Sequence, residues 1–497
     1  MSGDDSFVEQ VPRYDVDVPK TDIFEANMDM IEYLYQGDIM LSPEEIEHLT
    51  STRSKRNTLN GELHSNVRWE TNRPIAFTIS NHIGGKTANL IRKALKIWEN
   101  NTCLTFKENG DATGSTALQF ISGGGCSSFV GKQYKRPSQT ISIRNSCGYL
   151  ATILHEIGHA LGMHHTQSRV DRDNFVYVDQ NAVYRNLWFN YKKEPADNNF
   201  NYGVRYDYGS IMHYGPSNDQ IEYFCLTCSD SFAIYSSKPT MIAKMSLNYH
   251  KTMGQRVFLA FSDIWVINKH HKCTEKCDRY HTPCQNGGYS NPRDCHSCKC
   301  PDGFSGQYCT ERSPGDDLHN CGRTVWATKS WKNLKGKIGK DVWEEIPEMR
   351  CFFHINAPKG QRIELRLNSI PSKVCTDNCQ YGHTEFKVTD PRYYGYRFCC
   401  PEDAHGKTFK SDRNQVVIVL RSAFHYQIKQ IKLDFAEDSK SSKENIPRFI
   451  AAFRFGSNRT FRIKSDFSDQ IGLFGSDPNW IRFIISDCTY MQSKKLE

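Results

Sequence analysis

Cysteine spacing constrains what this chain can fold into more than any other feature of its sequence. The chain has 19 cysteines, the first at Cys103, and six of them fall between Cys277 and Cys309. Such crowding, with almost no apolar periodicity between the cysteines, indicates a small module held by disulfide bonds and made in an oxidising compartment. The first ten residues, MSGDDSFVEQ, are acidic and lack the apolar stretch of a signal peptide. We give the cysteines more weight and expect a secreted protein whose true N-terminus is missing or which is exported by another route.

Length and composition further limit the classes of protein to which this chain can belong. A length of 497 residues predicts several domains, and an apolar fraction of 38% is sufficient for packed cores. The net charge of +7 comes from charges mixed along the chain, with no basic stripe, so nucleic-acid binding is not expected. No apolar run approaches the roughly 18 residues of a membrane-spanning helix.

The stretch HEIGHALGMHH, residues 155–165, predicts a metal site. Apolar residues at helical spacing run through it, and His155 and His159, four positions apart, project from the same side of the predicted helix. Gly162 can adopt a positive φ and end the helix, so that the chain turns and returns His165 as a third nitrogen ligand. Three imidazoles with one open coordination position are typical of a catalytic rather than a structural zinc site.

Glu156 stands beside these ligands on the predicted helix. Zinc lowers the pKa of a bound water to about 7, and Glu156 is placed to accept its proton. The alternative is a helix with incidental surface histidines, but the pattern with Gly162 and His165 arises by chance in about one in ten thousand such chains. His164 falls outside the spacing and is expected to face solvent or to lie outside the ligand set.

A second motif, Ser210-Ile211-Met212-His213-Tyr214, follows the histidine motif along the chain. A methionine in a tight turn below three histidines provides an apolar floor for a metal, and Tyr214 can reach the metal or an oxyanion. Taken alone, the methionine is interpreted as a core residue, but together with the histidine motif the functional interpretation is favoured.

The histidine motif, the segment Arg169-x-Asp171-Arg172-Asp173 and the Ser-x-Met-His-Tyr turn together resemble the astacin family of metzincin metalloendopeptidases, over residues 24–273. The family usually has a glutamate after the third histidine that helps to anchor the mature N-terminus, and Thr166 replaces it here. The resemblance implies one Zn²⁺ per subunit, bound by His155, His159 and His165. It also implies that Glu156 is the general base and that Tyr214 is a fifth zinc ligand, which swings away to stabilise the tetrahedral intermediate.

The N-terminal residues resemble a pro-segment. Residues 1 to about 25 are polar and predicted to be disordered, and an amphipathic stretch, 24–49, follows. It contains Tyr35-Gln36-Gly37-Asp38-Ile39, which resembles the family's pro-segment motif, so Asp38 is expected to cap the zinc in the zymogen. The basic residues Arg53, Lys55 and Arg56 lie in a polar loop that suits a processing protease, although a solvated charge cluster is the alternative.

Three folded domains are predicted. Alternating Ile75, Phe77 and Ile79 indicate a half-buried strand, and residues 90–98 indicate a helix. The first domain is therefore expected to be α/β (α+β), which the resemblance makes a metzincin-like fold. After the cysteine-rich module the pattern becomes all-β, with alternation at 363–367, 386–388, 417–419 and 431–435. We expect this organisation: pro-segment 1–56, peptidase domain 57–273, EGF-like module 274–310, CUB-like β-sandwich 321–437, and a tail 438–497 with no assigned role.

The two C-terminal modules carry resemblances of their own. The cysteines at 277–309 with Asn286-Gly287-Gly288 resemble an EGF-like module, without a calcium-binding signature, and the β-rich stretch resembles a CUB domain. Astacins with this arrangement are typical of nematodes, and such modules usually bind substrates, matrix or partners. The cysteines of the EGF-like module are Cys277, Cys284, Cys295, Cys298, Cys300 and Cys309.

Disulfide pairing is implied only in part. Family order pairs Cys103 with Cys273 and Cys126 with Cys147, and Cys321–Cys351 is similar to the opening disulfide of a CUB domain. A local Cys225–Cys228 disulfide is favoured over a zinc ribbon. The sequence leaves open the pairing of Cys375, Cys379, Cys399 and Cys400, and Cys488 is the best candidate for a free thiol or an intermolecular bond.

These observations predict a secreted zinc-dependent endopeptidase, made as a zymogen, that hydrolyses extracellular or cuticle proteins. Asn100 and Asn458 are glycosylation acceptors if the chain is secreted. One alternative is a catalytically inactive EGF/CUB binding protein, and another is a structural metal site. A matrixin-type metzincin is disfavoured because no cysteine precedes Arg56 to cap the zinc.

Overall fold

The structure is a computed structural model. It describes residues 23–50, 68–195, 201–216, 239–316, 321–338, 349–370, 375–376, 378–404, 406–422 and 428–438. All of these belong to the first of two compact units, residues 1–442 and 443–497. Among the described residues, no helix is both long enough and apolar enough to cross a membrane.

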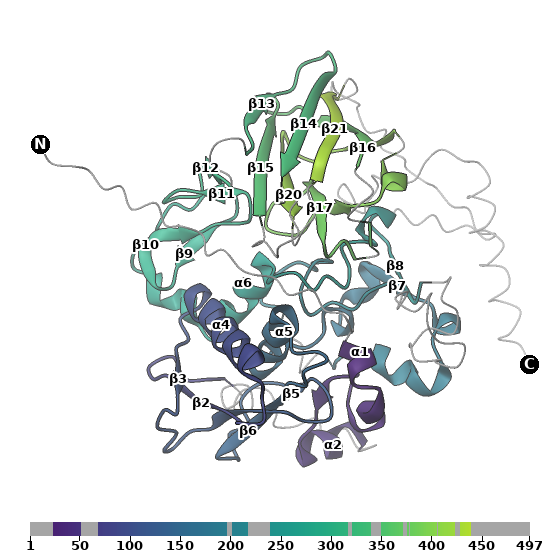
Figure 1. The fold of residues 1–497 in the computed structure, drawn as a ribbon. Helices are drawn as coiled ribbons and strands as arrows, with labels where there is room; N and C mark the ends of the chain where they lie inside the picture. The colour runs from purple at the N-terminus through teal and green to yellow at the C-terminus, as the bar shows by residue number, and fades with distance from the viewer. Residues whose placement is uncertain are drawn as a thin grey trace, which may run out of the picture. The chain divides into compact units, whose positions relative to one another are not determined.

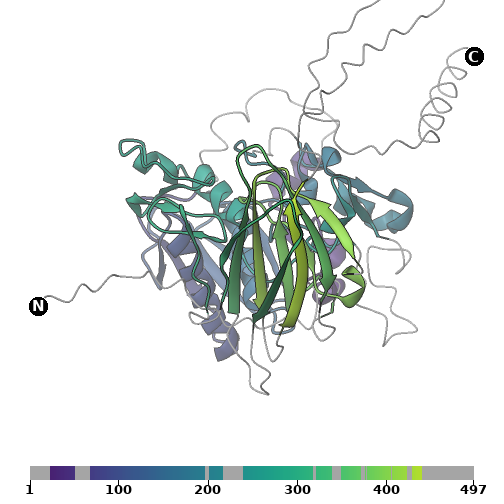
Figure 2. The ribbon, with the colours of Figure 1, turned by 90° about the horizontal axis from the view of Figure 1, so that it is seen from above.

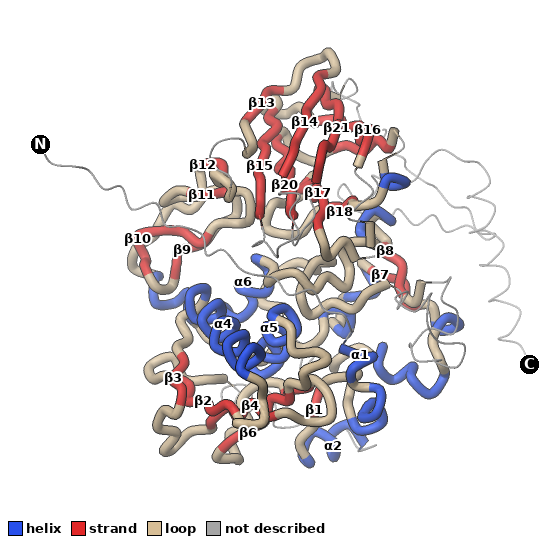
Figure 3. The backbone as a smooth tube through the Cα atoms, viewed as in Figure 1, coloured by secondary structure: helices blue, strands red, loops and turns tan. Residues whose placement is uncertain are grey.

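A six-stranded sheet with strand order β1-β5-β6-β4-β2-β3 forms the frame of the N-terminal half (Figure 3). Neighbouring strands run parallel except β5 and β6, which are antiparallel. The strands are β1 (Ile39–Met40), β2 (Ile75–Ile79), β3 (Phe106–Glu108), β4 (Ala117–Ile121), β5 (Ser127–Phe129) and β6 (Ser138–Ser142).

Two helices, α4 (Gly85–Asn101) and α5 (Leu150–Ala160), lie together on one face of this sheet (Figure 1). The apolar positions of α4 recur at helical spacing, and the indole Nε1 of Trp98 donates to the carbonyl of Leu154 at 3.2 Å. The predicted strand and helix are therefore confirmed. The half-buried alternation expected for β2 is found only at its end, because Ile75, Ala76 and Phe77 are all buried and Thr78 is exposed.

Shorter elements complete this half. The predicted disorder ends near residue 25, and the described chain is already helical at Ile23: Ile23 and Phe24 are buried in α1. The remaining helices and strands are α1 (Ile23–Ala26), α2 (Pro43–Thr50), α6 (Phe261–His270), β7 (Val176–Val178), β8 (Met241–Ala243), and the 3₁₀ helices η1 (Met28–Tyr33), η2 (Thr166–Ser168), η3 (Arg172–Asn174), η4 (Gln180–Ala182), η5 (Arg185–Tyr191), η6 (Leu247–Tyr249) and η7 (Cys273–Cys277).

A cysteine-rich module follows α6. Its disulfides are Cys277–Cys295, Cys284–Cys298 and Cys300–Cys309. Its strands form two two-stranded sheets: β9 (Tyr289–Asn291) with β10 (Asp294–Lys299), and β11 (Phe304–Ser305) with β12 (Glu311–Arg312).

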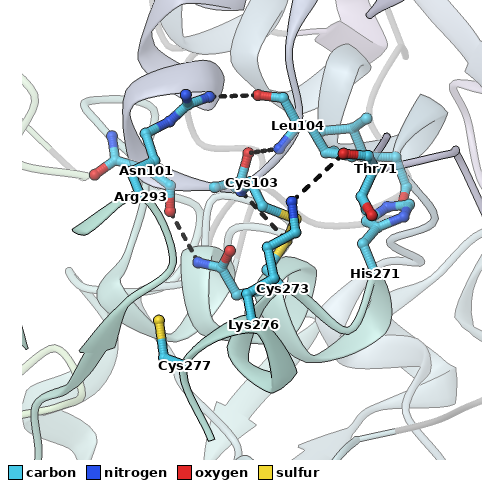
Figure 4. The surroundings of a disulfide bond; sticks show 12 residues. Thr71, Asn101, Cys103, Leu104, His271, Cys273, Lys276, Cys277 and Arg293 are labelled. Carbon is cyan, nitrogen blue, oxygen red and sulfur yellow. Dashed lines mark hydrogen bonds between the residues drawn. A yellow bond between two sulfur atoms is a disulfide. The ribbon is translucent and has the colours of Figure 1, made fainter. Parts of the chain in front are cut away.

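The module is bonded to the end of α4 beside the Cys103–Cys273 disulfide (Figure 4). The guanidinium of Arg293 donates to the carbonyls of Leu104 (2.6 Å) and Glu99 (2.5 Å), and Lys299 Nζ donates to the carbonyl of Asn100 (2.9 Å). Cations at the C-terminus of a helix are stabilised by its unpaired carbonyl groups.

The C-terminal described part is a two-sheet β-sandwich, seen from above in Figure 2. One sheet has the order β13-β15-β20-β17-β18 and the other β14-β21-β16-β19. The strands are β13 (Thr324–Trp326), β14 (Lys332–Ile338), β15 (Met349–Asn356), β16 (Ile363–Ser369), β17 (Gly382–Lys387), β18 (Tyr396–Phe398), β19 (Lys407–Lys410), β20 (Gln415–Ser422) and β21 (Ile428–Glu437), with the short helix η9 (Pro401–Asp403).

The pairings of the remaining described cysteines follow from this fold. The disulfides are Cys126–Cys147 in the first half and Cys321–Cys351, Cys375–Cys400 and Cys379–Cys399 in the sandwich. The first, like Cys103–Cys273, is the pair that family order implies, and the last two are the pairs that the sequence left open.

Strand β20, predicted from the alternation at 417–419, is present and buried on both faces. Val416, Ile418 and Leu420 face the sandwich core, whereas Val417 and Val419 pack against Phe304 and Phe352. Both faces are buried because the cysteine-rich module covers the outer one. Several predicted features lie outside the described residues: the basic loop Arg53, Lys55 and Arg56, the cysteines Cys225, Cys228 and Cys488, and the acceptor Asn458.

Adjacent positions on α4 test this packing. Leu95 is 2% exposed, whereas the side chain of its neighbour Lys96 is 65% exposed. We expect Leu95→Ala to lower the free energy of unfolding of this domain by about 2–5 kcal/mol, because it leaves a cavity in the core. Lys96→Ala should change it by less than about 0.5 kcal/mol. Thermal and denaturant unfolding of both variants measure the difference, and equal effects would contradict the assigned core.

Candidate metal centre

Helix α5 presents two of the three motif histidines from a buried position. All eleven of its residues are buried, including His155 and His159. The helix ends at Ala160, whose carbonyl accepts from Trp69 Nε1 at 2.7 Å. Gly162 then takes a φ of +107°, and a Cβ at this position would lie 2.8 Å from His270 Nε2. The turn that returns the chain therefore requires glycine, as predicted.

The turn brings His165 to the same point as the two helical histidines. The Nε2 atoms of His155 and His165 lie 3.4 Å apart. Asp38 Oδ2 is 3.1 Å from His155 Nε2, and Asp38 Oδ1 is 3.2 Å from His165 Nε2 and 3.5 Å from His159 Nε2. One ligand atom from each of the four residues lies within 4.8 Å of all the others, and each side chain is at most 1% exposed.

Hydrogen bonds at the opposite ring nitrogens orient the three imidazoles. His155 Nδ1 is 2.8 Å from the carbonyl of Ile211, and His159 Nδ1 is 2.7 Å from the carbonyl of Met163. His165 Nδ1 is 3.0 Å from the side-chain Oε1 of Gln36. Each Nδ1–H thus has an oxygen acceptor, which leaves each Nε2 lone pair free for a metal.

The donor set fits zinc. Among the described residues, His159 Nε2 and Asp38 Oδ1 are buried without a hydrogen-bond partner, although both point at the common centre. Buried polar atoms normally have a partner, so this pair indicates a position for a ligand that both can bind. Imidazole nitrogens with a carboxylate oxygen are a ligand set that zinc accepts.

The electrostatics of the centre favour metal binding by neutral imidazoles. Burial lowers the pKa of His155 to about 4 and that of His165 to about 3, so both rings are neutral near pH 7. Burial opposes ionisation of Asp38, but the three histidine side chains around its carboxylate hold its pKa well below the usual value.

Glu156 lies on α5 between the two helical histidines. Both of its carboxylate oxygens are buried and, among the described residues, have no hydrogen-bond partner. Burial, with a further contribution from the charge of Asp38, raises the pKa of Glu156 well above its ordinary value. An unsolvated carboxylate with a raised pKa is a strong proton acceptor, the property expected of a general base.

The Ser210–Tyr214 turn lies directly against α5. Met212 is fully buried, and its Sδ would be 3.1 Å from a Cβ built on Gly158. The backbone N–H of Thr166 donates to the carbonyl of Met212 at 3.0 Å, which joins the turn to the residue after the third histidine. The predicted apolar floor is thus present, and Met212 packs closely against Gly158.

Two residues that sequence reasoning missed hold this turn. Asp263 accepts from Ser210 Oγ (2.6 Å) and from the N–H of Ile211 (2.9 Å). Arg256 Nη1 donates to the carbonyls of Ile211 and His213, each at 3.0 Å. Both residues follow the turn by more than 40 positions along the chain, and no local pattern connects them with it.

Tyr214 reaches the centre from the same turn. Its hydroxyl donates to the backbone carbonyl of Gln36 at 2.5 Å, and its ring lies 4.7 Å from that of His165, centroid to centroid. Burial, followed by the charge of Asp38, raises its pKa well above the usual value, so the hydroxyl stays protonated and able to donate.

The segment around Asp38 is a tight hairpin. The N–H of Tyr35 donates to the carbonyl of Ile39 and the N–H of Ile39 to that of Tyr35, at 2.8 and 2.9 Å. Gly37 at its tip has a φ of +80°. Strand β1 continues from it and pairs in parallel with β5 at the edge of the sheet.

Gln36 and Glu194 were also missed as functional candidates. Glu194 Oε1 accepts from Gln36 Nε2 (2.7 Å) and from the hydroxyl of Tyr35 (3.0 Å), and its side chain is 3% exposed. Gln36 falls inside the quoted pro-segment motif, but Glu194 comes from a loop that no motif marks. His164 is outside the cluster, as expected, with Nδ1 3.7 Å from Glu194 Oε1.

The comparisons agree with this geometry. The peptidase family described as Astacin matches residues 62–272. The chain is 33% identical to the zinc metalloproteinase nas-28 of Caenorhabditis elegans, over 81% of this chain and 78% of that protein. It is 31% identical to the zinc metalloproteinase nas-27 of the same organism, over 80% of this chain and 88% of that protein. A solved structure, high choriolytic enzyme 1, a hatching enzyme zinc-protease from Oryzias latipes, is 28% identical, with a TM-score of 0.36 over 42% of this chain and 96% of that chain.

The family match, the relatives nas-28 and nas-27 and the histidine centre define a zinc metalloendopeptidase. The chain belongs to the astacin family, and its cofactor is zinc.

Neighbouring histidines test the ligand set. His165→Ala removes one of the three converging nitrogens, and we expect the affinity for Zn²⁺ to fall on the order of a hundredfold or more. His164→Ala, next to it in the chain, should retain one zinc per chain. Zinc content after dialysis and competition with a chromophoric chelator measure both, and equal zinc loss in the two variants would contradict the assignment.

Proposed function

We propose that the chain is a secreted zinc metalloendopeptidase made as a latent zymogen, with Asp38 as the group that blocks the metal. The observation that carries the proposal is the position of Asp38, whose carboxylate lies between the Nε2 atoms of His155, His159 and His165. The three histidines would hold the zinc, and the Asp38 carboxylate would keep water away from it.

Zinc held there supplies a Lewis acid that polarises the scissile carbonyl and lowers the pKa of water. Glu156 accepts the proton of the attacking water and later donates it to the leaving amine. Its raised pKa and unsolvated carboxylate support this role. Tyr214 donates its hydroxyl to the oxyanion, a role supported by the bond that it already donates to a peptide oxygen, the carbonyl of Gln36.

Latency also involves the edge of the sheet. Strand β1 pairs with β5 immediately after Asp38, so the pro-segment occupies an edge at which a substrate strand can pair. We infer that cleavage in the basic loop at Arg53, Lys55 and Arg56 releases it. Asn27 strengthens the latent state, because its side chain bonds both the N–H (2.7 Å) and the carbonyl (2.6 Å) of Cys126.

An extracellular location and extracellular substrates, such as matrix or cuticle proteins, complete the proposal. The disulfide bonds of the described residues support an oxidising compartment. We assign residues 1–56 to the pro-segment, 57–273 to the peptidase, 274–310 to an EGF-like module and 321–437 to a CUB-like sandwich that binds substrates or partners. An inactive binding protein is not favoured, because the ligand set and Glu156 are complete.

Glu156→Gln tests the base. The change keeps the shape of the side chain and removes its proton affinity, so kcat/KM should fall by at least about a thousandfold while zinc stays bound. Fluorogenic peptide hydrolysis by the activated variant, with zinc content as the control, measures this. Substantial hydrolysis by the zinc-loaded variant would show that another group is the base.

Asp38→Ala tests latency. Without the carboxylate the uncleaved chain should hydrolyse peptides measurably, whereas the uncleaved wild-type chain should not. Asp29→Ala is the matched control, because Asp29 lies in the same segment with its side chain 86% exposed. Intact chain length is verified by mass spectrometry. A silent Asp38→Ala zymogen that becomes active after cleavage would place the block elsewhere in the pro-segment.

A further inference from the structure

The side-chain amide of Gln36 is bound at both ends by the peptidase domain. Its Oε1 accepts from His165 Nδ1 and from Ser168 Oγ, each at 3.0 Å, and its Nε2 donates to Glu194 Oε1 at 2.7 Å. Because a carboxylate only accepts, the Nε2 end must face Glu194, and the oxygen then faces the two donors. Gln36 itself is fully buried.

We call the three groups that bind it, His165 Nδ1, Ser168 Oγ and Glu194 Oε1, the amide pocket. The pocket belongs to the enzyme rather than to the pro-segment. Ser168 lies in η2, three residues after His165, and both are fully buried. The backbone N–H of Glu194 donates to the carbonyl of Ser168 at 2.7 Å, so the loop that carries the acceptor is bonded to the element that carries the donors. These bonds do not involve the pro-segment, and the pocket therefore keeps its arrangement when the pro-segment leaves.

The amide pocket lies beside the place of reaction. Gln36 precedes the metal-blocking Asp38 by two residues, and its own backbone carbonyl accepts from the Tyr214 hydroxyl. When the pro-segment leaves, the donors His165 and Ser168 and the carboxylate of Glu194 lose their partner, the side chain of Gln36. Leaving such groups unpaired costs free energy, so an occupant that pairs all three is favoured.

We propose that the mature enzyme uses the amide pocket to recognise a glutamine side chain of the substrate, within two residues of the scissile bond. This inference rests on the proposed function, because it requires that substrate replaces the pro-segment. A glutamine reproduces the contacts of Gln36. A glutamate has nearly the same shape but places its carboxylate against that of Glu194. A methionine fills the space and leaves the donors and the acceptor unpaired, and a lysine pairs with Glu194 but offers His165 and Ser168 no acceptor.

The test uses the full chain after activation and loading with zinc. Cleavage of a peptide library first finds a substrate sequence. Quenched fluorescent peptides are then made that differ only by Gln, Glu or Met at each of the two positions on either side of the cleaved bond. We expect one position at which kcat/KM for Gln exceeds that for Glu and Met by about tenfold or more, because a site built from donors and acceptors rejects an isostere that mispairs them.

Two variants test whether the preference for glutamine comes from the amide pocket. Glu194→Gln replaces the acceptor by an amide that can donate to a glutamate, so the Gln-to-Glu ratio of kcat/KM at that position should fall at least about tenfold. Ser168→Ala removes one donor and should lower the Gln-to-Met ratio. Asp173→Asn is the matched control: Asp173 is 56% exposed, is paired with Lys193 at 2.6 Å, and its change should leave both ratios as in the wild type. Ratios measured within one variant are independent of how much of it folds.

Two results would overturn the inference while leaving the proposed function intact: equal rates for Gln and Glu at all four positions in the wild type, or an unchanged ratio in both Glu194→Gln and Ser168→Ala. Absence of any hydrolysis by the zinc-loaded, activated wild type would instead overturn the proposed function, and the inference with it.

Discussion

The centre depends on the hydrogen bonds that hold the three imidazoles by their outward nitrogens. His155 and His159 donate to backbone carbonyls, those of Ile211 and Met163, which lie outside the N-terminal hairpin. His165 differs, because its partner is the side chain of Gln36 from the N-terminal hairpin. Two ligands are therefore oriented by backbone carbonyls of the peptidase fold, and the third by a side chain of the hairpin. In the zymogen that we propose, release of the hairpin would remove this partner and change the environment of the third zinc ligand.

The hairpin at residues 35–39 makes three kinds of contact at once. A carboxylate at the metal position, a carboxamide in the amide pocket and a strand paired to β5 all come from this one short segment and the residue after it. The same groups of the enzyme serve the substrate in our proposals, since the metal, the amide pocket and the strand edge all become available together. In these proposals, inhibition and substrate recognition use the same groups of the enzyme. The glutamine of the inhibitory segment then has the same side chain as the substrate residue that the amide pocket binds.

The C-terminal modules pack as parts of the described structure. Arg293 and Lys299 bond to carbonyls at the end of α4, the helix that packs against α5. The outer face of β20 is covered by the cysteine-rich module, with Phe304 against Val417 and Val419. The alternation at 417–419 predicts this strand correctly, but periodicity does not show that a separate module buries its second face.

The sequence by itself determined the local part of this protein. The spacing of His155 and His159 on a helix, the positive φ at Gly162, and the strand and helix of the first domain follow from backbone geometry within a dozen residues, and the structure has all of them. Only the tertiary structure decided which distant groups complete the site. No short-range pattern connects the histidines with the segments that carry Asp263, Arg256 and Glu194. These three residues act through hydrogen bonds to residues that are 45 to 158 positions away in the sequence. Helix and turn geometry repeats with a fixed period that a sequence displays, whereas contacts between remote segments depend on how whole elements pack, and packing leaves no periodic trace.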